Sequence, residues 1–317
     1  MQNERPNVSV VMSVYDKPPD VRKTIDSVLE QSGINLELLI IDDGASQDVV
    51  DVLAEYDTNP SIQIIRQNNQ GLTKALIKGC SLAKHDYIAR IDSGDVMLAN
   101  RLSQQAAVLT QYPNVGIVSS WVNIVTDEGY DLYQLKHSTK ELRDGLLSNT
   151  AKCFKSPFHA SVMFRKSTYL QVGGYRSEFY FTQDCDLWAR MIESSDVYNI
   201  DETLTHGLFS ASGISGDYAN EQKNLKKLVI AARQCRQQGL NEESVLQQAS
   251  TIQKTAKVHS EDGFNGLYFI AKCLHDKKSV HAEEYWQRVL QVNSLSLRAW
   301  FFYAISKFYS YGNKATS

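Results

Sequence analysis

Residues 84–101 of this 317-residue chain are KHDYIARIDSGDVMLANR. The apolar run Tyr87–Ile91 predicts a short buried strand, and two carboxylates, Asp92 and Asp95, follow at its carboxyl end. An isolated acid pair of this kind is usually a solvated turn with a helix cap. Similar polar clusters follow other apolar runs of the chain, and this recurrence indicates a site.

Strands and helices alternate through the first part of the chain. VSVVMSVYD (Val8–Asp16), ELLIIDDG (Glu37–Gly44) and IQIIR (Ile62–Arg66) are typical of buried strands, and an amphipathic helical segment follows each of them. This order predicts an α/β fold with a doubly wound, mostly parallel, Rossmann-like sheet within residues 1–217. Residues 218–317 show only helical patterns and predict a C-terminal all-α helical module.

Four polar clusters follow the predicted strands. They are Tyr15-Asp16, Asp42-Asp43-Gly44, Asn68-Asn69-Gln70-Gly71 and Asp92-Ser93-Gly94-Asp95. Ligands of open α/β sheets bind beyond the carboxyl ends of the strands, so the four clusters predict one site. Carboxylate oxygens of Asp92 and Asp95, with water and phosphate oxygens, suit Mg²⁺ or Mn²⁺. We expect Asp43 to accept a hydrogen bond from a nucleotide base, and one acid of the Asp42-Asp43 pair merely to cap a turn.

Composition excludes several classes of protein. The net charge of −3 gives the whole molecule no nucleic-acid footprint. No GxGxxG follows the first strand and no P-loop lysine occurs, which argues against dinucleotide oxidoreductases and P-loop kinases. The five cysteines form no CxxC pair, so neither a zinc site nor a disulfide framework is expected. A polar amino-terminal segment and the lack of any apolar run near 20 residues favour a cytoplasmic location.

Charge is unevenly distributed along the chain. Residues 1–220 hold 28 Asp and Glu against 19 Lys and Arg, whereas residues 221–317 hold 8 against 14. A basic C-terminal module can rest on an anionic membrane surface, at the inner face of the cell membrane, or it can simply be solvated. The aromatic stretch RAWFFYAISKFYSYG (residues 298–312) has too many polar residues to span a membrane, and it equally suits a core helix of a bundle.

Six segments, taken in order, resemble family 2 glycosyltransferases of the GT-A fold over residues 7–217. The segments are VSVVMSVYDK, LELLIIDDGASQD, NNQGLTKALIKG, YIARIDSGD, HASVMFRK and GGYRSEFYFTQDCDLWARM. The resemblance implies inverting transfer of a sugar from a nucleoside-diphosphate sugar, with a UDP-sugar favoured, to an acceptor hydroxyl on a growing polysaccharide or lipid-linked glycan. It implies donor contacts by Tyr15, Asp16, Asp43, Asn69, Gly71, Asp92 and Ser93, and a divalent metal ion, Mg²⁺ or Mn²⁺, at Asp92 and Asp95.

The resemblance also assigns roles in the second half of the chain, each with a structural alternative. Asp184 matches the general base, although spacing alone favours a helix-capping residue. His159 and His206 are candidates for the acceptor or the diphosphate, and His159 is equally suited to a structural role. Trp188 either floors the acceptor pocket or belongs to the core.

The chain departs from the family pattern at three positions. Gly94 replaces the third acid of the usual Asp-x-Asp-Asp metal motif, so metal binding must depend on Asp92 and Asp95. Gln183 replaces the glutamate that usually precedes the base, and Gln70 replaces an arginine near the donor. Two alternatives therefore stay open: a non-catalytic nucleotide-sugar or protein-binding module with a decayed metal site, and a sugar nucleotidyltransferase.

Overall fold

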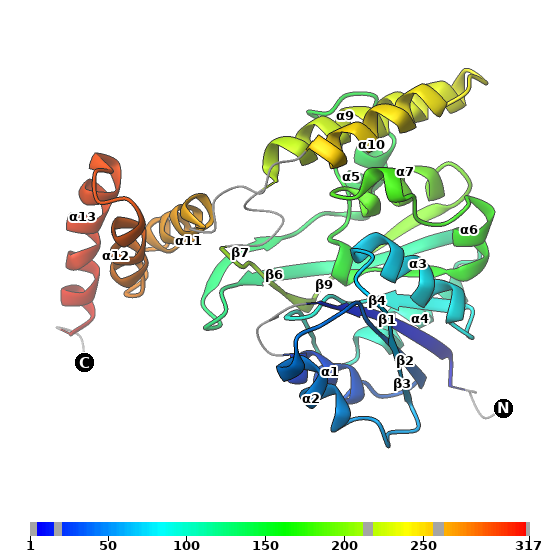
Figure 1. Ribbon diagram of the computed structural model, residues 1–317, viewed down its shortest axis with the longest axis horizontal. Helices are drawn as coiled ribbons and strands as arrows, with labels where there is room; N and C mark the ends of the chain where they lie inside the picture. Colours follow the sequence, from blue (N-terminus) through cyan, green and yellow to red (C-terminus); the bar gives the residue numbers. More distant parts are fainter. Residues whose placement is uncertain (1–4, 16–20, 212–217, 256–262, 315–317) are drawn as a thin grey trace. The chain divides into compact units, whose positions relative to one another are not determined.

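The computed structural model describes residues 5–15, 21–211, 218–255 and 263–314 (Figure 1). The strands are β1 (Asn7–Val14), β2 (Asn35–Asp42), β3 (Ile62–Arg66), β4 (Tyr87–Arg90), β5 (Val96–Met97), β6 (Val115–Val125), β7 (Asp131–Leu135), β8 (Met163–Arg165) and β9 (Asp196–Leu208). The α-helices are α1 (Val21–Leu29), α2 (Gln47–Ala54), α3 (Leu72–Leu82), α4 (Arg101–Gln111), α5 (Thr139–Leu146), α6 (Lys166–Gln171), α7 (Gln183–Met191), α9 (Ala219–Gln237), α10 (Glu243–Thr255), α11 (Phe264–Asp276), α12 (Ala282–Val292) and α13 (Leu297–Lys314). Two 3-10 turns are η1 (His159–Ser161) and η2 (Ser177–Phe179).

One nine-stranded sheet has the order β3-β2-β1-β4-β8-β6-β9-β5, with β7 paired to β6. β1 runs parallel to β2 and β4, and β2 runs parallel to β3. β8 is antiparallel to both β4 and β6, and β5 is antiparallel to β9. The predicted α/β class is confirmed, but the sheet is mixed, because β8 and β5 each run antiparallel to their neighbouring strands.

The sheet is buried on both faces. Val10 and Met12 of β1 pack into a core with α1, α2 and α4, whereas Val11 between them packs with Leu39 and helices α3, α5 and α7 on the other face. Successive side chains of a strand point to opposite faces, so a continuous apolar run such as β1 requires helices on both sides. This double burial fixes the register of the parallel strands and therefore the positions of the loops at their carboxyl ends.

Two segments differ from what their own sequences predict. The polar sequence of residues 126–138 predicts an irregular excursion, but these residues contain β7, which pairs with β6. In the turn between the two strands, the Thr126 amide donates to the Tyr130 carbonyl at 3.0 Å and the Gly129 amide donates to the Thr126 carbonyl at 2.8 Å. The small and polar residues from His206 onward predict a flexible segment, but β9 continues to Leu208. In both places, pairing with a neighbouring strand outweighs a weak local strand propensity.

Contacts between residues divide the chain into two compact units. The first comprises residues 1–122, 135–207 and 221–255, and the second comprises residues 123–134, 208–220 and 256–317. Helices α9 and α10 therefore belong to the first unit, while α11, α12 and α13 belong to the second. The predicted domain boundary between residues 217 and 218 stays a prediction. None of the described helices combines the length and apolarity that a membrane span requires.

Ion pairs fasten α9 to the first unit. The Arg236 guanidinium donates to Glu193, just after α7, and to Glu242, each at 2.8 Å. Arg233 donates to the Leu146 carbonyl at the end of α5 at 2.8 Å. Arg176, beside η2, also pairs with Glu242. The arginines of α9 are therefore used in packing within this unit.

A buried ion pair stabilises α7. Arg190 donates to the Asp186 carboxylate at 2.6 Å and to the carbonyls of Val172 and Gly174 at 2.6 and 2.7 Å. Both side chains are almost fully buried. Removing one partner of such a pair leaves a buried charge without compensation.

We therefore predict that Asp186→Asn lowers the free energy of unfolding by about 3–5 kcal/mol, as expected for a broken buried pair. Urea denaturation followed by circular dichroism measures this change. The matched control is Asp144→Asn, which breaks an exposed pair at the same i,i+4 spacing with Lys140 and should leave the denaturation midpoint nearly unchanged. Equal midpoint shifts for the two variants would contradict the assignment.

Candidate active site

The Asp92–Asp95 segment forms a tight turn at the carboxyl end of β4. The Asp95 amide donates to the Asp92 carbonyl at 3.1 Å, and Gly94 has φ +97°. Positive φ at the third position is the requirement of type II turns, and glycine meets it without a steric cost. An aspartate at position 94 would be strained. The absence of the third acid from the metal motif is therefore built into this turn.

Thr24 of α1 fixes the turn through two hydrogen bonds. Its buried hydroxyl accepts a hydrogen bond from the Gly94 amide at 2.9 Å and donates to the Asp95 carbonyl at 2.8 Å. Ser27, one turn further along α1, accepts from the Met97 amide at 3.1 Å. The helix that follows the first strand thus positions the backbone that carries both acids.

Asp92 lies between two cationic partners. The Arg90 guanidinium donates through Nη2 to both carboxylate oxygens at 3.0 Å, and His159 Nε2 lies 2.9 Å from one of them. Burial by itself raises the pKa of Asp92, but the charges of Arg90 and His159 and their hydrogen bonds outweigh it and hold the pKa well below its usual range. Asp92 is therefore ionised at neutral pH.

His159 connects Asp92 to Asp184. It begins the 3-10 turn η1 before β8, and its Nδ1 lies 3.9 Å from Asp184 Oδ2. Burial lowers the pKa of His159, but the charge of Asp92 and its hydrogen bond more than reverse this effect, so the pKa lies above the usual value. One imidazole thus lies between the predicted donor-side acid and the predicted base.

Asp184 is the second residue of α7 and lies in its first turn. Thr182 occupies the N-cap position of this helix, and the structure gives it no side-chain capping bond. Asp184 therefore does not occupy the N-cap position, but as an acid in the first turn it complements the helix dipole. Its carboxylate also lies near His159, at the same edge of the sheet as Asp92.

Asp92, Asp95 and His159 offer ligand atoms that all lie within 4.8 Å of one another. Two carboxylates fit Mg²⁺ or Mn²⁺, and an imidazole is compatible with the softer of the two, Mn²⁺. Asp95 itself is 3% exposed and lies at the inner side of the cluster. These three residues are the group that fits a divalent ion, and His159 is a member that the sequence did not suggest as a ligand.

Asp43 organises the loop after β3. One of its carboxylate oxygens accepts from Gln67 Nε2 at 2.7 Å and from the Gln70 amide at 2.9 Å, and the other accepts from the Gly71 amide at 2.8 Å. Asp42, its neighbour, accepts from the Ala45 amide at 2.9 Å, as expected for the acid that caps a turn. Both carboxylates are thus tied to backbone loops of the site edge.

The loop that Asp43 holds also approaches the second half of the chain. Gly71 has φ +89°, and a Cβ at this position would lie 2.9 Å from Cε2 of Tyr180. The Asn69 side-chain oxygen accepts from the Gly71 amide at 3.0 Å. Glycine is therefore required both by the backbone and by the ring packed over it.

The remaining predicted residues are distributed unevenly. Tyr15 directly follows β1 and is exposed, Ser93 lies within the turn between the two acids, and Asp16 lies outside the described residues. His206 pairs with Val96 in the β5–β9 ladder, one residue from Asp95. Trp188 is completely buried and packs on Phe164 at a ring distance of 5.6 Å, which matches the core interpretation and leaves its ring away from solvent.

Sequence reasoning missed two residues of the site. Arg90 is 2% exposed and supplies the strongest charge beside Asp92, and Thr24 fixes the turn. A basic residue inside the apolar run YIARI was a visible signal for Arg90, because a buried arginine requires a nearby acid. No comparable signal marked Thr24, a polar residue on the buried face of α1 beside Val21 and Val28.

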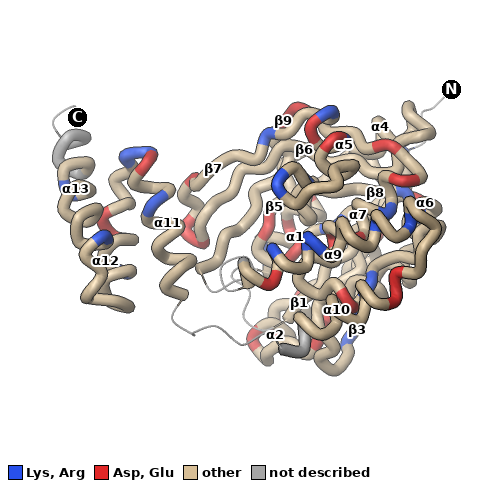
Figure 2. The backbone as a smooth tube through the Cα atoms, turned by 90° about the horizontal axis from the view of Figure 1, so that it is seen from above, with Lys and Arg blue, Asp and Glu red and all other residues tan. Residues whose placement is uncertain are grey.

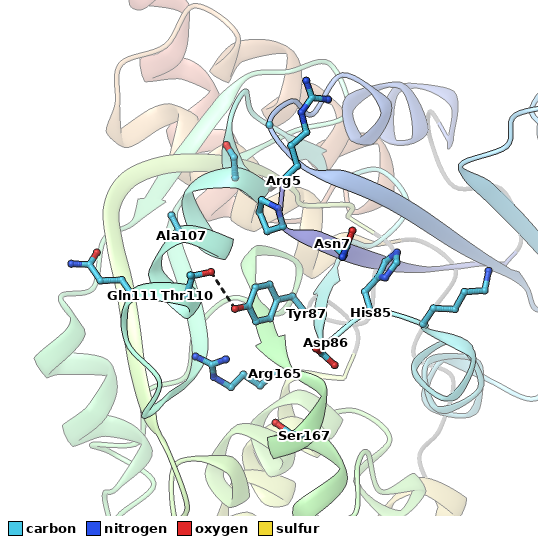
Figure 3. A pocket seen from close by; sticks show the side chains of 14 residues that line it. Arg5, Asn7, His85, Asp86, Tyr87, Ala107, Thr110, Gln111, Arg165 and Ser167 are labelled. Carbon is cyan, nitrogen blue, oxygen red and sulfur yellow. Dashed lines mark hydrogen bonds between the residues drawn. The ribbon is translucent and has the colours of Figure 1, made fainter. Parts of the chain in front are cut away.

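A cavity of about 1110 Å³ lies at the opposite edge of the sheet, beside the amino ends of β1 and β4 (Figure 3). One of its two arginines, Arg165, donates to the Val115 and Tyr112 carbonyls at 2.8 and 3.1 Å and lies over the Tyr87 ring. The Tyr87 and Thr110 hydroxyls are 3.2 Å apart. This basic side chain therefore serves packing, and the acid cluster lies at the other end of the strands.

The Asp92–His159 contact predicts how His159 titrates. Its ion pair should contribute stability that is complete below the unfolded pKa of about 6.5 and is lost as the pH rises through the raised folded pKa. In protein treated with a chelator, NMR titration of the His159 ring should give a midpoint above 6.5, and Asp92→Asn should lower it. His159→Gln assigns the signal. A midpoint that Asp92→Asn leaves unchanged would contradict the pairing.

Comparison with known proteins identifies a matching family and several similar proteins. Residues 9–169 match the family model described as "Glycosyl transferase family 2". The "Putative glycosyltransferase EpsE" of Bacillus subtilis is 31% identical over 209 residues, which cover 64% of this chain and 73% of that protein. The "UDP-Gal:alpha-D-GlcNAc-diphosphoundecaprenol beta-1,3-galactosyltransferase" of Escherichia coli is 28% identical over 216 residues, 66% of this chain and 77% of that protein.

A solved structure supports the fold. The crystal structure of S. aureus TarS 1-349 superposes with a TM-score of 0.54 at 11% sequence identity, and the match covers 96% of this chain and 92% of that one. At this identity the likeness concerns the fold alone, and it agrees with the mixed α/β sheet followed by helices described above. Together with the family match over half of the chain, these relatives show that the protein is a glycosyltransferase and belongs to glycosyl transferase family 2.

Proposed function

We propose that this glycosyltransferase moves a sugar from a UDP-sugar to an acceptor hydroxyl on a growing polysaccharide or lipid-linked glycan, with inversion at the anomeric carbon. The observation that carries the proposal is the position of His159, 2.9 Å from Asp92 and 3.9 Å from Asp184. Asp92, the predicted donor-side acid, and Asp184, the predicted base, therefore lie near the same imidazole ring.

Asp184 is the general base in this proposal. Its carboxylate takes the proton of the acceptor hydroxyl while the hydroxyl oxygen attacks C1 of the sugar from the face opposite the leaving diphosphate. The new bond forms between that oxygen and C1, the bond from C1 to the diphosphate oxygen breaks, and the nucleoside diphosphate leaves with the bonding pair. Attack from the opposite face inverts the anomeric configuration.

Asp92, Asp95 and His159 would hold the divalent ion. When bound, the ion supplies Lewis-acid stabilisation of charge on the departing diphosphate. Arg90 keeps Asp92 ionised without occupying the open side of the cluster, since its own side chain is buried. Asp43 orders the loop around Asn69 and Gly71, which we propose as part of the nucleoside pocket together with Tyr15, Asp16 and Ser93.

The donor and acceptor classes come from the relatives. The Escherichia coli relative is described as acting with UDP-Gal on a diphosphoundecaprenol-linked sugar, and TarS 1-349 was solved in complex with UDP. Glycosyltransferases named for amylovoran and O-antigen biosynthesis, AmsE of Erwinia amylovora and WbnJ of Escherichia coli, are also similar to this chain. These descriptions favour a UDP-sugar donor and an acceptor in surface polysaccharide synthesis.

The geometry favours this enzyme over a decayed binding module. Gly94 meets a backbone requirement of the turn, so its presence has a structural reason other than decay of the metal site. A sugar nucleotidyltransferase would need a basic glycine-rich loop after β1 to hold a triphosphate. The chain has VYDKPPD at this place, which does not match such a loop.

Asp184→Asn should abolish transfer while leaving the donor site intact, because the amide cannot accept the proton. We expect the rate to fall by about 10²–10⁴-fold, the usual contribution of a general base. The assay follows product formation by mass spectrometry from UDP-galactose and a synthetic lipid-diphosphate-linked GlcNAc acceptor. Asp201→Asn, at an exposed position of β9, is the control. Turnover near the wild-type rate in Asp184→Asn would remove this residue as the base.

Donor binding tests the other side of the site. Isothermal titration should show UDP binding that Mn²⁺ strengthens, and Asp92→Asn should weaken it by at least about tenfold, since a charged contact is lost. Asp144→Asn serves as the control for a surface acid. Failure of the wild-type protein to bind UDP, dTDP or GDP, with or without Mn²⁺, would overturn the proposed function.

A further inference from the structure

Helix α13 has an apolar face that no described residue covers. Leu297, Phe301 and Phe308 are spaced by four and seven residues, and their exposed fractions lie between 62% and 83%. At 100° per residue they share one side of the helix. Ala299 and Ser306 lie on the other side and are fully buried. The helix thus packs through one face and exposes a second apolar face opposite to it.

Aromatic and basic side chains border this exposed face. The Trp300 ring is 48% exposed, while its indole N–H donates to the Ser294 carbonyl at 2.8 Å. The Lys307 ammonium lies 4.5 Å above the centre of the Tyr303 ring. Rings with one polar end, and lysines that lie along apolar surface, are typical of side chains at a membrane–water interface.

The charge around this face is positive. Residues 297–309 include Arg298 and Lys307 and no acid (Figure 2). On the neighbouring helices, Asp276 is paired with Lys272, and Glu284 with Arg288. These two acids are therefore neutralised by their own neighbours, and Arg298 and Lys307 lie in a stretch of α13 that has no acid.

A groove next to this face is lined by both apolar and basic side chains. It has a volume of about 450 Å³ and lies between α11 and α13. Its lining residues are Tyr268, Lys272, Leu297, Arg298, Phe301 and Phe302. Lys272 is paired with Asp276, so Arg298 is the cation of this groove that suits an anionic group. Apolar walls beside an arginine fit a lipid, whose acyl region contacts the rings and whose phosphate contacts the guanidinium.

We propose that the outer face of α13, defined as Leu297, Trp300, Phe301 and Phe308 with Arg298 and Lys307, docks on an anionic phospholipid membrane. A second copy of the chain is a poorer occupant, because a two-fold contact would place the same two cations against each other. In the sequence, a membrane contact was suggested by the basic charge of residues 221–317 and by the aromatic stretch of residues 298–312. In the structure the arginines of α9 are paired within the first unit, whereas α13 combines cations with an exposed apolar face. The proposal goes beyond the reaction and does not depend on it.

Vesicle sedimentation with the full chain tests this face. The wild-type protein should pellet with vesicles of phosphatidylcholine containing one quarter phosphatidylglycerol, and should pellet little with phosphatidylcholine alone. The triple variant Leu297→Ser, Phe301→Ser, Phe308→Ser should lower the partition coefficient by about tenfold or more, because three apolar side chains no longer insert. The pair Arg298→Gln, Lys307→Gln should lower it by a similar factor and weaken its dependence on salt.

The matched control is Leu170→Ser, Leu240→Ser, which removes two exposed leucines of the first unit and should leave partitioning unchanged. Circular dichroism and UDP titration on every variant separate the outcomes. Unchanged folding and UDP binding with lost partitioning support the proposal, whereas absent UDP binding in the wild type would overturn only the proposed reaction. Equal partitioning of the wild type and the triple variant would overturn the membrane proposal. So would a wild-type dimer, seen by light scattering, that the triple variant converts to a monomer.

Discussion

The pairing of the buried Arg90 with Asp92 is the constraint on which the site depends. Arg90 ends β4 with its side chain 2% exposed, and a guanidinium in that position is stable only beside an acid that stays ionised. The turn after the strand supplies this acid, and Thr24 and Gly94 fix the turn. The Asp92 carboxylate therefore also stabilises the buried Arg90 at the end of β4. Its position is determined before any ligand binds.

Two further carboxylates, those of Asp43 and Asp184, belong to the same candidate site and make different contacts. The carboxylate of Asp43 accepts hydrogen bonds from the loop after β3 and so orders the loop that we propose as part of the nucleoside pocket. Asp184 lies in the first turn of α7, at the far side of His159. The ion pair of Asp186 and Arg190 fixes the same helix from its buried side. Preorganisation of this kind places charges where a reaction needs them and avoids rearrangement during it.

Local pattern was enough to predict the parallel strands and the clusters at their ends, because buried parallel strands are continuous apolar runs and their carboxyl ends share one edge. It could not predict the antiparallel strands β7, β8 and β9 in full, since their registers depend on partners distant in sequence. The contact of His159 with both Asp92 and Asp184 spans residues 92 to 184, and no local pattern encodes such a meeting. Gly94 looked like the loss of a ligand in the sequence, and only its φ of +97° gives it a structural reason.

The measurement that tests the central claim most directly is paramagnetic broadening of backbone NMR signals by Mn²⁺ with UDP. This ion and nucleotide should broaden the amides of residues 92–95, 159 and 184, and UDP alone should shift those of residues 43–44 and 67–71. The amide signals of Tyr87 and Arg165, which line the cavity at the opposite edge, serve as the internal reference and should remain sharp. Broadening concentrated around that cavity, with the acid cluster unaffected, would contradict the assignment of the active site.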